Sequence, residues 1–184
     1  MHRHFLFPVI QQLKPMLVHE TQLEGVKLIS PPTNFEDFRG SYVELYNQRV
    51  YQESGIAQDF IQDDISTSRQ NVLRGVHGDL ITWKLISCLY GSLYLLVVNN
   101  NPKSAQFRQW QSFTLSDKNR LQVLVPPRFG NGHLVLTETA IFHYKQTTDY
   151  DRDIQFTIAW DDPAFKMWWP VKHPILSVRD EGKE

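Results

Sequence analysis

Short runs of β-branched, aromatic and alternating apolar residues dominate the hydrophobic pattern of this chain, and turn residues separate them. Each run has the length and the period of a β-strand. We predict strands at 41–46, 72–76, 82–88, 92–98, 122–125, 132–136, 140–146 and 156–160. Only 47–55 and 116–119 are typical of a short helix or helical turn. Many short strands with few helices predict an all-β antiparallel sandwich or barrel, a class that includes jelly rolls.

The chain of 184 residues predicts a single domain, which we place at 26–184 after an N-terminal arm at 1–25. The apolar run at 5–10 is too short for a membrane span, and no small-residue cleavage site follows it, so we assign it to the arm. With 19 basic and 20 acidic residues, the composition gives no reason to expect a nucleic-acid partner. We expect a cytoplasmic protein without a membrane partner. A single cysteine excludes a disulfide framework and a thiolate zinc cluster within the chain.

The segment 74–79, Arg-Gly-Val-His-Gly-Asp, is the densest group of candidate functional residues. Strand alternation predicts Arg74 on one face and His77 on the opposite face. A histidine side chain ordinarily titrates near neutral pH, so His77 could act as a base, although a structural histidine at a strand end fits these residues equally well. Lys84 stands in the next apolar run, where an outward position is common and an inward one would require an anion beside it.

Two further segments carry groups that could transfer protons. In the run at 140–146, alternation places Tyr144 with Phe142 on one face and His143 with Lys145 on the other. Tyr144 could be a core residue or an acid. Near the C-terminus, Asp180 offers a carboxylate that could be a solvated surface charge or a partner for a base.

A metal site is an alternative interpretation of the same residues. His77, Asp79 and a distal histidine, either His133 or His143, match the two-histidine, one-carboxylate pattern of non-haem iron oxygenases. Those enzymes also use β-barrels, so the predicted fold does not exclude this reading. The His-x-Asp pattern is short and arises easily by chance.

Motifs along most of the chain, taken in order, resemble the dTDP-4-dehydrorhamnose 3,5-epimerase family. The order is Phe-Glu-Asp-Phe-Arg-Gly at 35–40, Gln-Asp-Asp-Ile-Ser at 62–66, Arg-Gly-Val-His at 74–77, Lys-Leu at 84–85, the segment 126–132, Tyr-Lys at 144–145, Trp-Asp-Asp-Pro at 160–163, Trp-Pro at 169–170 and Leu-Ser-Val-Arg-Asp at 176–180. The resemblance implies a cupin-like jelly roll, a homodimer and a metal-independent isomerase without a cofactor. It also implies a substrate that is a nucleotide-linked 4-keto sugar for surface-polysaccharide or deoxysugar biosynthesis.

The resemblance assigns roles that suit epimerisation beside a ketone. His77 matches the base, Asp180 the carboxylate that orients it, Lys84 the cation beside the 4-keto oxygen, and Tyr144 the acid on the opposite face. Arg74 and Arg39 match arginines near the diphosphate, and Tyr150 matches an aromatic residue against the base. The implied substrate contacts also include Glu44, Gln62, Asp64, Asn131 and His133.

Several positions depart from the family pattern around these groups. Gly78-Asp79 replaces an aromatic residue and glutamine, Gly130-Asn131-Gly132-His133 replaces Ala-His-Gly-Phe, and Asp64 replaces asparagine. These changes flank the predicted catalytic groups, and they are similar to a side branch of the family that acts on GDP-linked 4-keto heptoses. The nucleotide, the sugar and the number of inverted centres therefore stay open. A non-catalytic sugar-nucleotide binding module is the remaining alternative.

Overall fold

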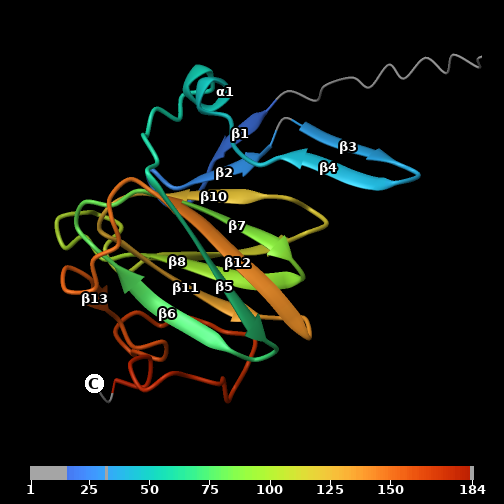
Figure 1. Ribbon diagram of the computed structural model, residues 1–184. Helices are drawn as coiled ribbons and strands as arrows, with labels where there is room; N and C mark the ends of the chain where they lie inside the picture. Colours follow the sequence, from blue (N-terminus) through green and yellow to red (C-terminus); the bar gives the residue numbers. More distant parts are fainter. Residues whose placement is uncertain (1–15, 32, 183–184) are drawn as a thin grey trace, which may run out of the picture.

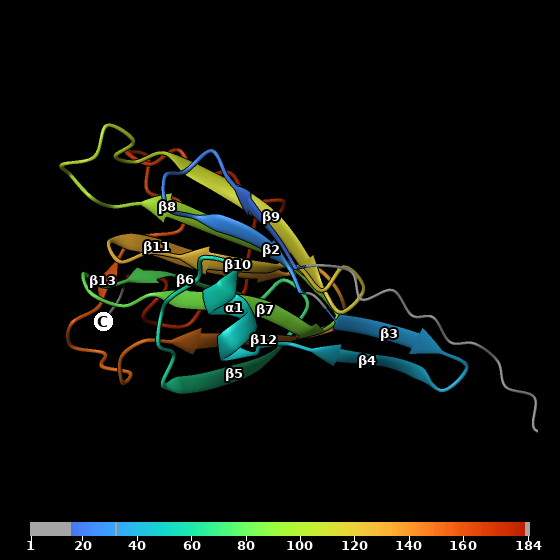
Figure 2. The same ribbon diagram turned by 90° about the horizontal axis from the view of Figure 1, so that it is seen from above.

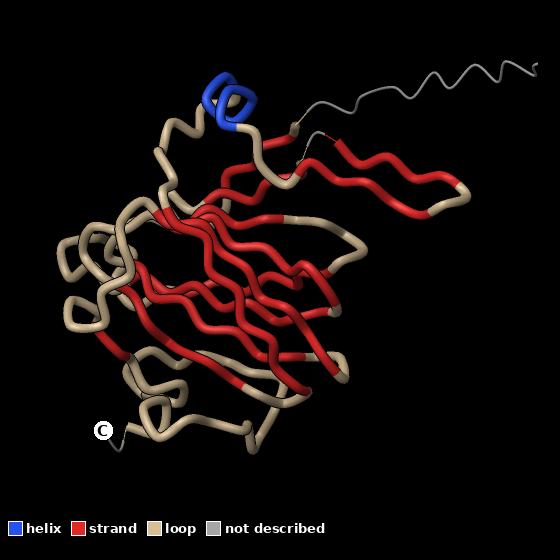
Figure 3. Tube along the Cα trace, in the orientation of Figure 1, coloured by secondary structure: helices blue, strands red, loops and turns tan. Residues whose placement is uncertain are grey.

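The computed structural model describes residues 16–31 and 33–182, with the backbone alone at 33–36 (Figure 1). The apolar run at 5–10 of the predicted arm lies outside these residues. Figure 3 shows that strands make up most of the body and that the one short helix of the described residues lies at the top of the view. The all-β prediction is confirmed.

Two antiparallel sheets face each other and form the body of the molecule (Figure 1). The six-stranded sheet has the order β1 (Leu17–Glu20), β2 (Lys27–Ser30), β10 (Gln122–Val125), β7 (Lys84–Tyr90), β12 (Thr139–Gln146) and β5 (Gln62–Arg69). The five-stranded sheet has the order β13 (Phe156–Thr157), β6 (Leu73–Gly78), β11 (Phe129–Val135), β8 (Ser92–Asn99) and β9 (Trp110–Ser116). A hairpin of β3 (Thr33–Asp37) and β4 (Gly40–Glu44) projects away from this body (Figure 2).

Strand β8 explains why an unbroken apolar run can occupy the middle of a sheet. Leu93, Leu95 and Val97 belong to the core between the two sheets. The alternate residues of β8 belong to a second core, where the C-terminal segment covers the outer face of the five-stranded sheet. Both faces of β8 are therefore buried, and period-2 alternation of apolar and polar residues is lost.

Strands β1, β2, β3, β5 and β9 were not among the predicted strands. In β5 the apolar signal is nearly absent, because its side chains are mostly polar and Ile65 is 65% exposed. Pairing with β12 along its whole length holds β5 at the edge of the six-stranded sheet. Backbone hydrogen bonds to the neighbouring strand therefore hold β5 in place. The alternation of apolar and polar residues gives no sign of these bonds.

The start of the β-structure lies earlier in the chain than the predicted domain boundary. β1 pairs with β2 in the six-stranded sheet, and Leu23 is 2% exposed within the core between the sheets. Residues 17–25 of the predicted arm thus contribute a strand and a core residue. The boundary at residue 25 falls inside the β-structure.

Both segments predicted as a short helix or helical turn are present, since 47–55 contains α1 (Gln48–Glu53) and 117–119 forms a turn after β9. Asn47 caps α1 by accepting a hydrogen bond from the Val50 amide, and Tyr51 is fully buried. Together with Ile56, Tyr51 covers the outer face of the six-stranded sheet over Leu85 and Leu124. No helix among the described residues is long and apolar enough to cross a bilayer.

Glycine is required at position 75 because β6 and β11 approach each other closely there. Gly75 has a φ of 112°, and a Cβ at this position would lie 2.6 Å from the Gly132 Cα and 2.7 Å from the Asn131 oxygen. Both contacts are with backbone, which cannot swing away as a flexible side chain could. Any larger residue would push the two strands apart.

We predict that Gly75→Ala lowers the free energy of unfolding by about 3 kcal/mol, since it combines a positive φ with a backbone clash. Gly55→Ala is the matched control, because Gly55 also has a positive φ of 85° but nothing lies within 4 Å of its Cβ position. Its expected cost is about 1 kcal/mol. Urea unfolding of both variants measures the difference, and equal costs would contradict the close approach of the strands.

Candidate active site

A cavity of about 330 Å³ lies between the two sheets and receives side chains from both. Strands β6 and β11 of the five-stranded sheet supply one wall, and strands β5, β7 and β12 of the six-stranded sheet supply the other. Its lining consists of Asp64, Ile65, Ser66, Arg74, Gly75, His77, Lys84, Asn131, His133, Phe142, Tyr144, Tyr150 and Gln155. Charged, neutral polar and aromatic groups therefore meet in one pocket between the sheets.

Arg74 and His77 both line this cavity, so the prediction that they lie on opposite faces is wrong. The reason is a register shift between β6 and β11, in which His77 pairs with Asn131 while Arg74 pairs with His133. Three steps along β6 match two steps along β11, and the extra residue changes the direction of the side chains. Gly75 lies in this irregular stretch.

The buried carboxylate of Asp180 meets His77 at the cavity wall. Oδ1 of Asp180 lies 3.0 Å from Nε2 of His77, although the ring N–H does not point directly along this contact. The Ser177 hydroxyl donates to the other oxygen at 2.8 Å, and the Gly75 amide donates to Oδ1 at 3.3 Å. Burial raises the pKa of Asp180, but the close contact with His77 and the hydrogen bond from Ser177 outweigh burial and lower it. The C-terminal segment is thus folded back onto β6.

Lys84 and Tyr144 stand on the wall contributed by the six-stranded sheet. Lys84 is 8% exposed, and burial lowers the pKa of its ammonium group. Its Nζ lies 5.9 Å from the centre of the Tyr144 ring. Burial and then the carboxylate of Asp64 raise the pKa of Tyr144, which keeps its phenol protonated. This wall therefore holds a buried cation beside a proton donor.

The remaining predicted residues around the cavity form a polar rim. Arg74 is fixed by a hydrogen bond from its Nε to the Ser68 hydroxyl at 3.0 Å. Gln62 donates to Asp64 at 2.8 Å and accepts from the Tyr150 amide at 2.8 Å, which ties the loop after β12 to β5. Asn131 and His133 project from β11 into the cavity lining.

Two predicted substrate contacts, Arg39 and Glu44, lie on the β3–β4 hairpin and do not line this cavity. Arg39 is exposed and forms an ion pair with Asp37 at 2.6 Å. Figure 2 shows the hairpin extending away from the sheets. Within one chain, these two residues are separated from the other predicted site residues.

The structure does not bring together the ligands that the iron-site alternative requires. Asp79 accepts hydrogen bonds from the Ile81 and Thr82 amides and so closes the turn after β6. Among residues 16–31 and 33–182, no three His, Cys, Asp or Glu side chains are grouped so that they could hold a metal ion. Asp79 has a structural role in the turn instead.

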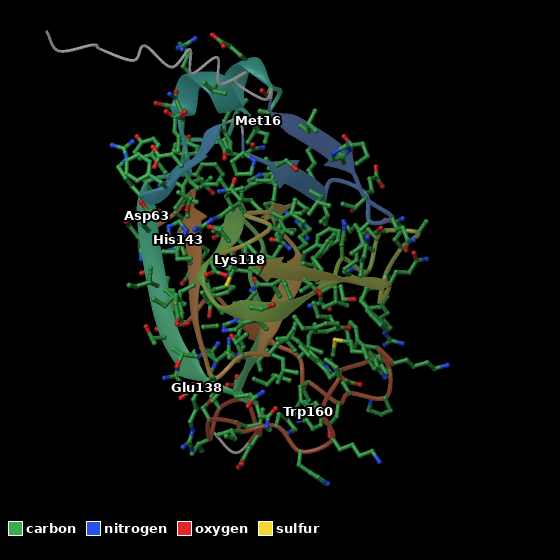
Figure 4. All side chains as sticks on the ribbon, turned by 90° about the vertical axis from the view of Figure 1, so that its right-hand side faces the viewer. Met16, Asp63, Lys118, Glu138, His143 and Trp160 are labelled. Atoms are coloured by element: carbon green, nitrogen blue, oxygen red, sulfur yellow. The ribbon has the colours of Figure 1, made fainter. Side chains whose placement is uncertain are left out.

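His143 belongs to a separate chain of contacts on the outer face of the six-stranded sheet (Figure 4). Its Nδ1 lies 2.9 Å from the Ser87 hydroxyl and its Nε2 lies 3.0 Å from Asp63, which also binds Lys145 at 2.7 Å. The predicted orientation of His143 and Lys145 away from Tyr144 is correct. Ser87 is 2% exposed and neither it nor His143 lines the cavity, so this arrangement joins strands and offers no accessible nucleophile.

Ser66 and Gln155 line the cavity but were not predicted as site residues. The Ser66 hydroxyl is enclosed and has no hydrogen-bond partner. Gln155 accepts a hydrogen bond from Arg179 at 3.2 Å, beside the Asp180 carboxylate. A signal for Ser66 was present, because it has the same parity as Asp64 along β5 and must share its face. Gln155 lies in a loop without periodicity and had no such signal.

Asp180 predicts a specific dependence of stability on pH. Its folded pKa is lower than the unfolded value of about 3.9, so its stabilisation is complete above about pH 5 and disappears as the pH falls through the lowered pKa. We expect Asp180→Asn to cost about 2 kcal/mol at pH 7. Urea unfolding should show this difference shrinking below about pH 4. Asp161→Asn, at an exposed carboxylate, controls for loss of one charge, and a pH-independent cost of Asp180→Asn would contradict the argument.

Comparison with known proteins places this geometry in context. Residues 20–184 match the family model described as dTDP-4-dehydrorhamnose 3,5-epimerase. The enzyme of that name from Escherichia coli is 37% identical over 171 residues, which cover 90% of this chain and 92% of the relative.

Two solved structures share the fold over nearly the whole chain. A Bacillus anthracis dTDP-4-dehydrorhamnose 3,5-epimerase with TDP and PPi bound has a TM-score of 0.85 and 35% identity, covering 90% of this chain and 96% of that one. A Legionella pneumophila dTDP-6-deoxy-D-glucose-3,5-epimerase in complex with dTDP-4-keto-L-rhamnose has a TM-score of 0.86 and 34% identity, covering 91% and 90%. This chain belongs to the dTDP-4-dehydrorhamnose 3,5-epimerase family.

Proposed function

We propose that the cavity between the sheets epimerises a nucleotide-linked 4-keto-6-deoxy sugar at C3, or at C3 and C5. The chain is an isomerase by its family, and one structural observation carries the assignment of residues. His77 with Asp180 lies on the wall from the five-stranded sheet, whereas Tyr144 lies on the wall from the six-stranded sheet. A sugar ring between these walls would have a base on one face and an acid on the other.

The first step is removal of a proton beside the ketone. A 4-keto group acidifies the protons at C3 and C5, so a positioned base can take one of them and leave an enolate. We assign this base to His77. The Asp180 carboxylate holds one ring nitrogen, stabilises the imidazolium that forms and leaves the other nitrogen to accept the proton.

Negative charge then develops on the former ketone oxygen. Lys84 is the buried cation on the cavity wall, and an ammonium group in a water-poor site stabilises an oxyanion strongly. The cost of burying Lys84 is offset when the enolate forms beside it. No step requires a metal ion, because the substrate's own ketone supplies the acidity.

Reprotonation from the opposite face completes the inversion. Tyr144 is protonated, as its raised pKa ensures, and lies on the opposite wall from His77. Arg74, held by Ser68, is the guanidinium group in the cavity and suits the diphosphate of the nucleotide. A binding module has no use for a base and an acid on opposite walls, which favours catalysis over the non-catalytic alternative.

Deuterium exchange in D₂O tests the two proton-transfer roles separately. His77→Asn should reduce exchange at C3 by about 10³-fold, because no base remains to form the enolate. Tyr144→Phe should reduce formation of the inverted product by at least about 10²-fold while retaining a larger share of exchange without inversion. The products can be resolved by NMR.

The two variants are informative because they predict different patterns. Exchange at the wild-type rate in His77→Asn would overturn the assignment of the base. Equal loss of exchange and inversion in Tyr144→Phe would overturn its role as the acid. Tight binding of nucleotide sugars by the wild-type chain without any exchange would instead support the non-catalytic module. Panels of dTDP-, GDP- and CDP-linked 4-keto sugars would identify the nucleotide.

We further propose that the protein is a homodimer in which the β3–β4 hairpin reaches the cavity of the second copy. The hairpin projects from the body, and Phe38 at its tip is 98% exposed (Figure 2). Arg39 and Glu44 lie on this hairpin, away from the cavity of their own chain. A second copy offers a way for both residues to contact substrate as predicted.

Light scattering should give a mass of about twice the 21.6 kDa of one chain. A mixed dimer provides a sharper test. When His77→Asn and Arg39→Ala chains are refolded together, one of the two cavities would combine an intact His77 with the intact Arg39 of the other chain. Activity should therefore rise above that of either variant alone. A monomer, or a mixture no more active than its parts, would contradict the proposal.

A further inference from the structure

The wall of the cavity formed by β11 carries polar groups that the proton-transfer steps do not use. His133 is 3% exposed, and its Nε2 atom is enclosed without a hydrogen-bond partner. The Oδ1 atom of Asn131 is also enclosed and unpaired. A buried polar group without a partner costs about 1–3 kcal/mol, so two of them on one wall indicate a site that a ligand completes.

Both side chains point into the cavity because of the alternation along β11. A Cβ on Gly132, the residue between them, would meet Trp169 and Val76 on the outer side of the sheet. Asn131 and His133 therefore project to the opposite side, where both line the cavity. The His133 ring stacks on Phe142 from the facing sheet, with centroids 4.0 Å apart and an interplanar angle of 10°. This stack fixes the plane of the imidazole.

His133 is a neutral group in this position. Burial first, and then the positive charge of Arg74, lower its pKa to about 3 despite the nearby carboxylate of Asp180. A neutral imidazole has one N–H donor and one acceptor nitrogen, and the Asn131 amide likewise offers both. Such a pair suits an uncharged hydroxyl group, which donates once and accepts from a second partner. It does not suit a phosphate, which needs cations or several donors.

The chemistry of the proposed substrate leaves one hydroxyl that can serve as a fixed anchor. In a 4-keto-6-deoxy sugar, C1 carries the diphosphate, C4 is the ketone and C6 is a methyl carbon. The C3 hydroxyl changes its direction when C3 is inverted. The C2 hydroxyl keeps its configuration throughout, so a rigid recognition group can hold it in both substrate and product.

We propose that His133, together with Asn131, is a specificity-determining contact that binds the C2 hydroxyl of the sugar and keeps the ring in place while C3 is inverted. This inference rests on the proposed function for the identity of the sugar. A sugar without that hydroxyl leaves the buried polar atoms of β11 unpaired, and a site built to bind a hydroxyl discriminates against such an analogue.

The test compares two ligands in two assays. Dissociation constants are measured for dTDP-6-deoxyglucose and for its 2-deoxy analogue, both of which lack the ketone and cannot react. Rates of C3 deuterium exchange are measured for the corresponding 4-keto sugars. We expect the wild-type protein to prefer the 2-hydroxy compound by at least about tenfold in each assay.

His133→Phe is the decisive variant, because phenylalanine retains the stack on Phe142 and removes both ring nitrogens. It should reduce the preference to less than about threefold, mainly by weakening the 2-hydroxy compound. His133→Gln, which restores a donor and an acceptor, should recover part of the preference. Circular dichroism melting reports whether each variant is folded, and His133→Leu, which also removes both ring nitrogens, replaces His133→Phe in the comparison if the latter is not.

The outcomes separate this inference from the proposed function. Equal weakening of both ligands by His133→Phe would show a purely structural role and overturn the inference, as would an unchanged preference. A preference that collapses in the binding assay while no chain supports exchange would uphold the His133 contact and overturn the epimerase mechanism. Exchange by the wild-type chain with no preference for the 2-hydroxy compound would uphold the epimerase and overturn the contact.

Discussion

The buried carboxylate of Asp180 is the constraint on which the site depends. An ionised carboxylate inside a protein is stable only when donors surround it. Here the Ser177 hydroxyl and the Gly75 amide donate to it and the His77 imidazole lies 3.0 Å away, so the C-terminal segment must lie against β6 for the site to exist. The same contacts bury the carboxylate, fold the C-terminal segment back onto β6 and orient His77, the proposed base. A chain truncated before Ser177 would lose the partner of the proposed base.

The cavity contains some side chains suited to charged groups of a ligand and others that stay uncharged themselves. Lys84 and Arg74 are the groups suited to charge, the first to an enolate oxygen and the second to a phosphate. Tyr144 and His133 are kept uncharged by burial, although burial acts in opposite directions on their pKa values. A phenol that retains its proton can donate it, and an imidazole that does not acquire one can accept from a hydroxyl. The same low-polarity environment therefore prepares an acid on one wall and a recognition group on the other.

Sequence reasoning predicted the strands with the strongest apolar runs and missed β1, β2, β3, β5 and β9, whose sequences are shorter or more polar. The class of fold and most strands followed from apolar periodicity, including β10 at Gln122–Val125. β5 was not predicted because pairing with β12, and not burial of its own apolar residues, holds it in place. The error at Arg74 and His77 has the same origin, since the register shift opposite β11 arises from the approach of two strands. Alternation describes one strand, whereas a bulge is a property of a pair.

Predicted residues from distant parts of the chain did converge, because family motifs carry information about contacts that periodicity lacks. His77, Lys84, Tyr144 and Asp180 are separated along the sequence, yet three of them line one cavity and the fourth supports its wall. Arg39 and Glu44 were assigned by the same resemblance, but they lie on the β3–β4 hairpin and do not line the cavity of their own chain. The order of the motifs thus predicts which residues belong to a site. It does not predict whether one chain or two copies of the chain supply them.

Facing sheets give this architecture a direct route to stereochemical inversion. Inversion requires that a proton leave one face of a carbon and return to the other, so the base and the acid must stand on opposite sides of the ring. A sandwich whose two inner faces each contribute one of these groups meets this requirement without any movement of the backbone. His77 reaches the cavity from β6 and Tyr144 from β12, and both strands are held within their sheets by neighbours on each side. The paired strands hold the proposed base and acid at a fixed separation, and the proposed contact of His133 would keep the flat enolate from turning between the two walls.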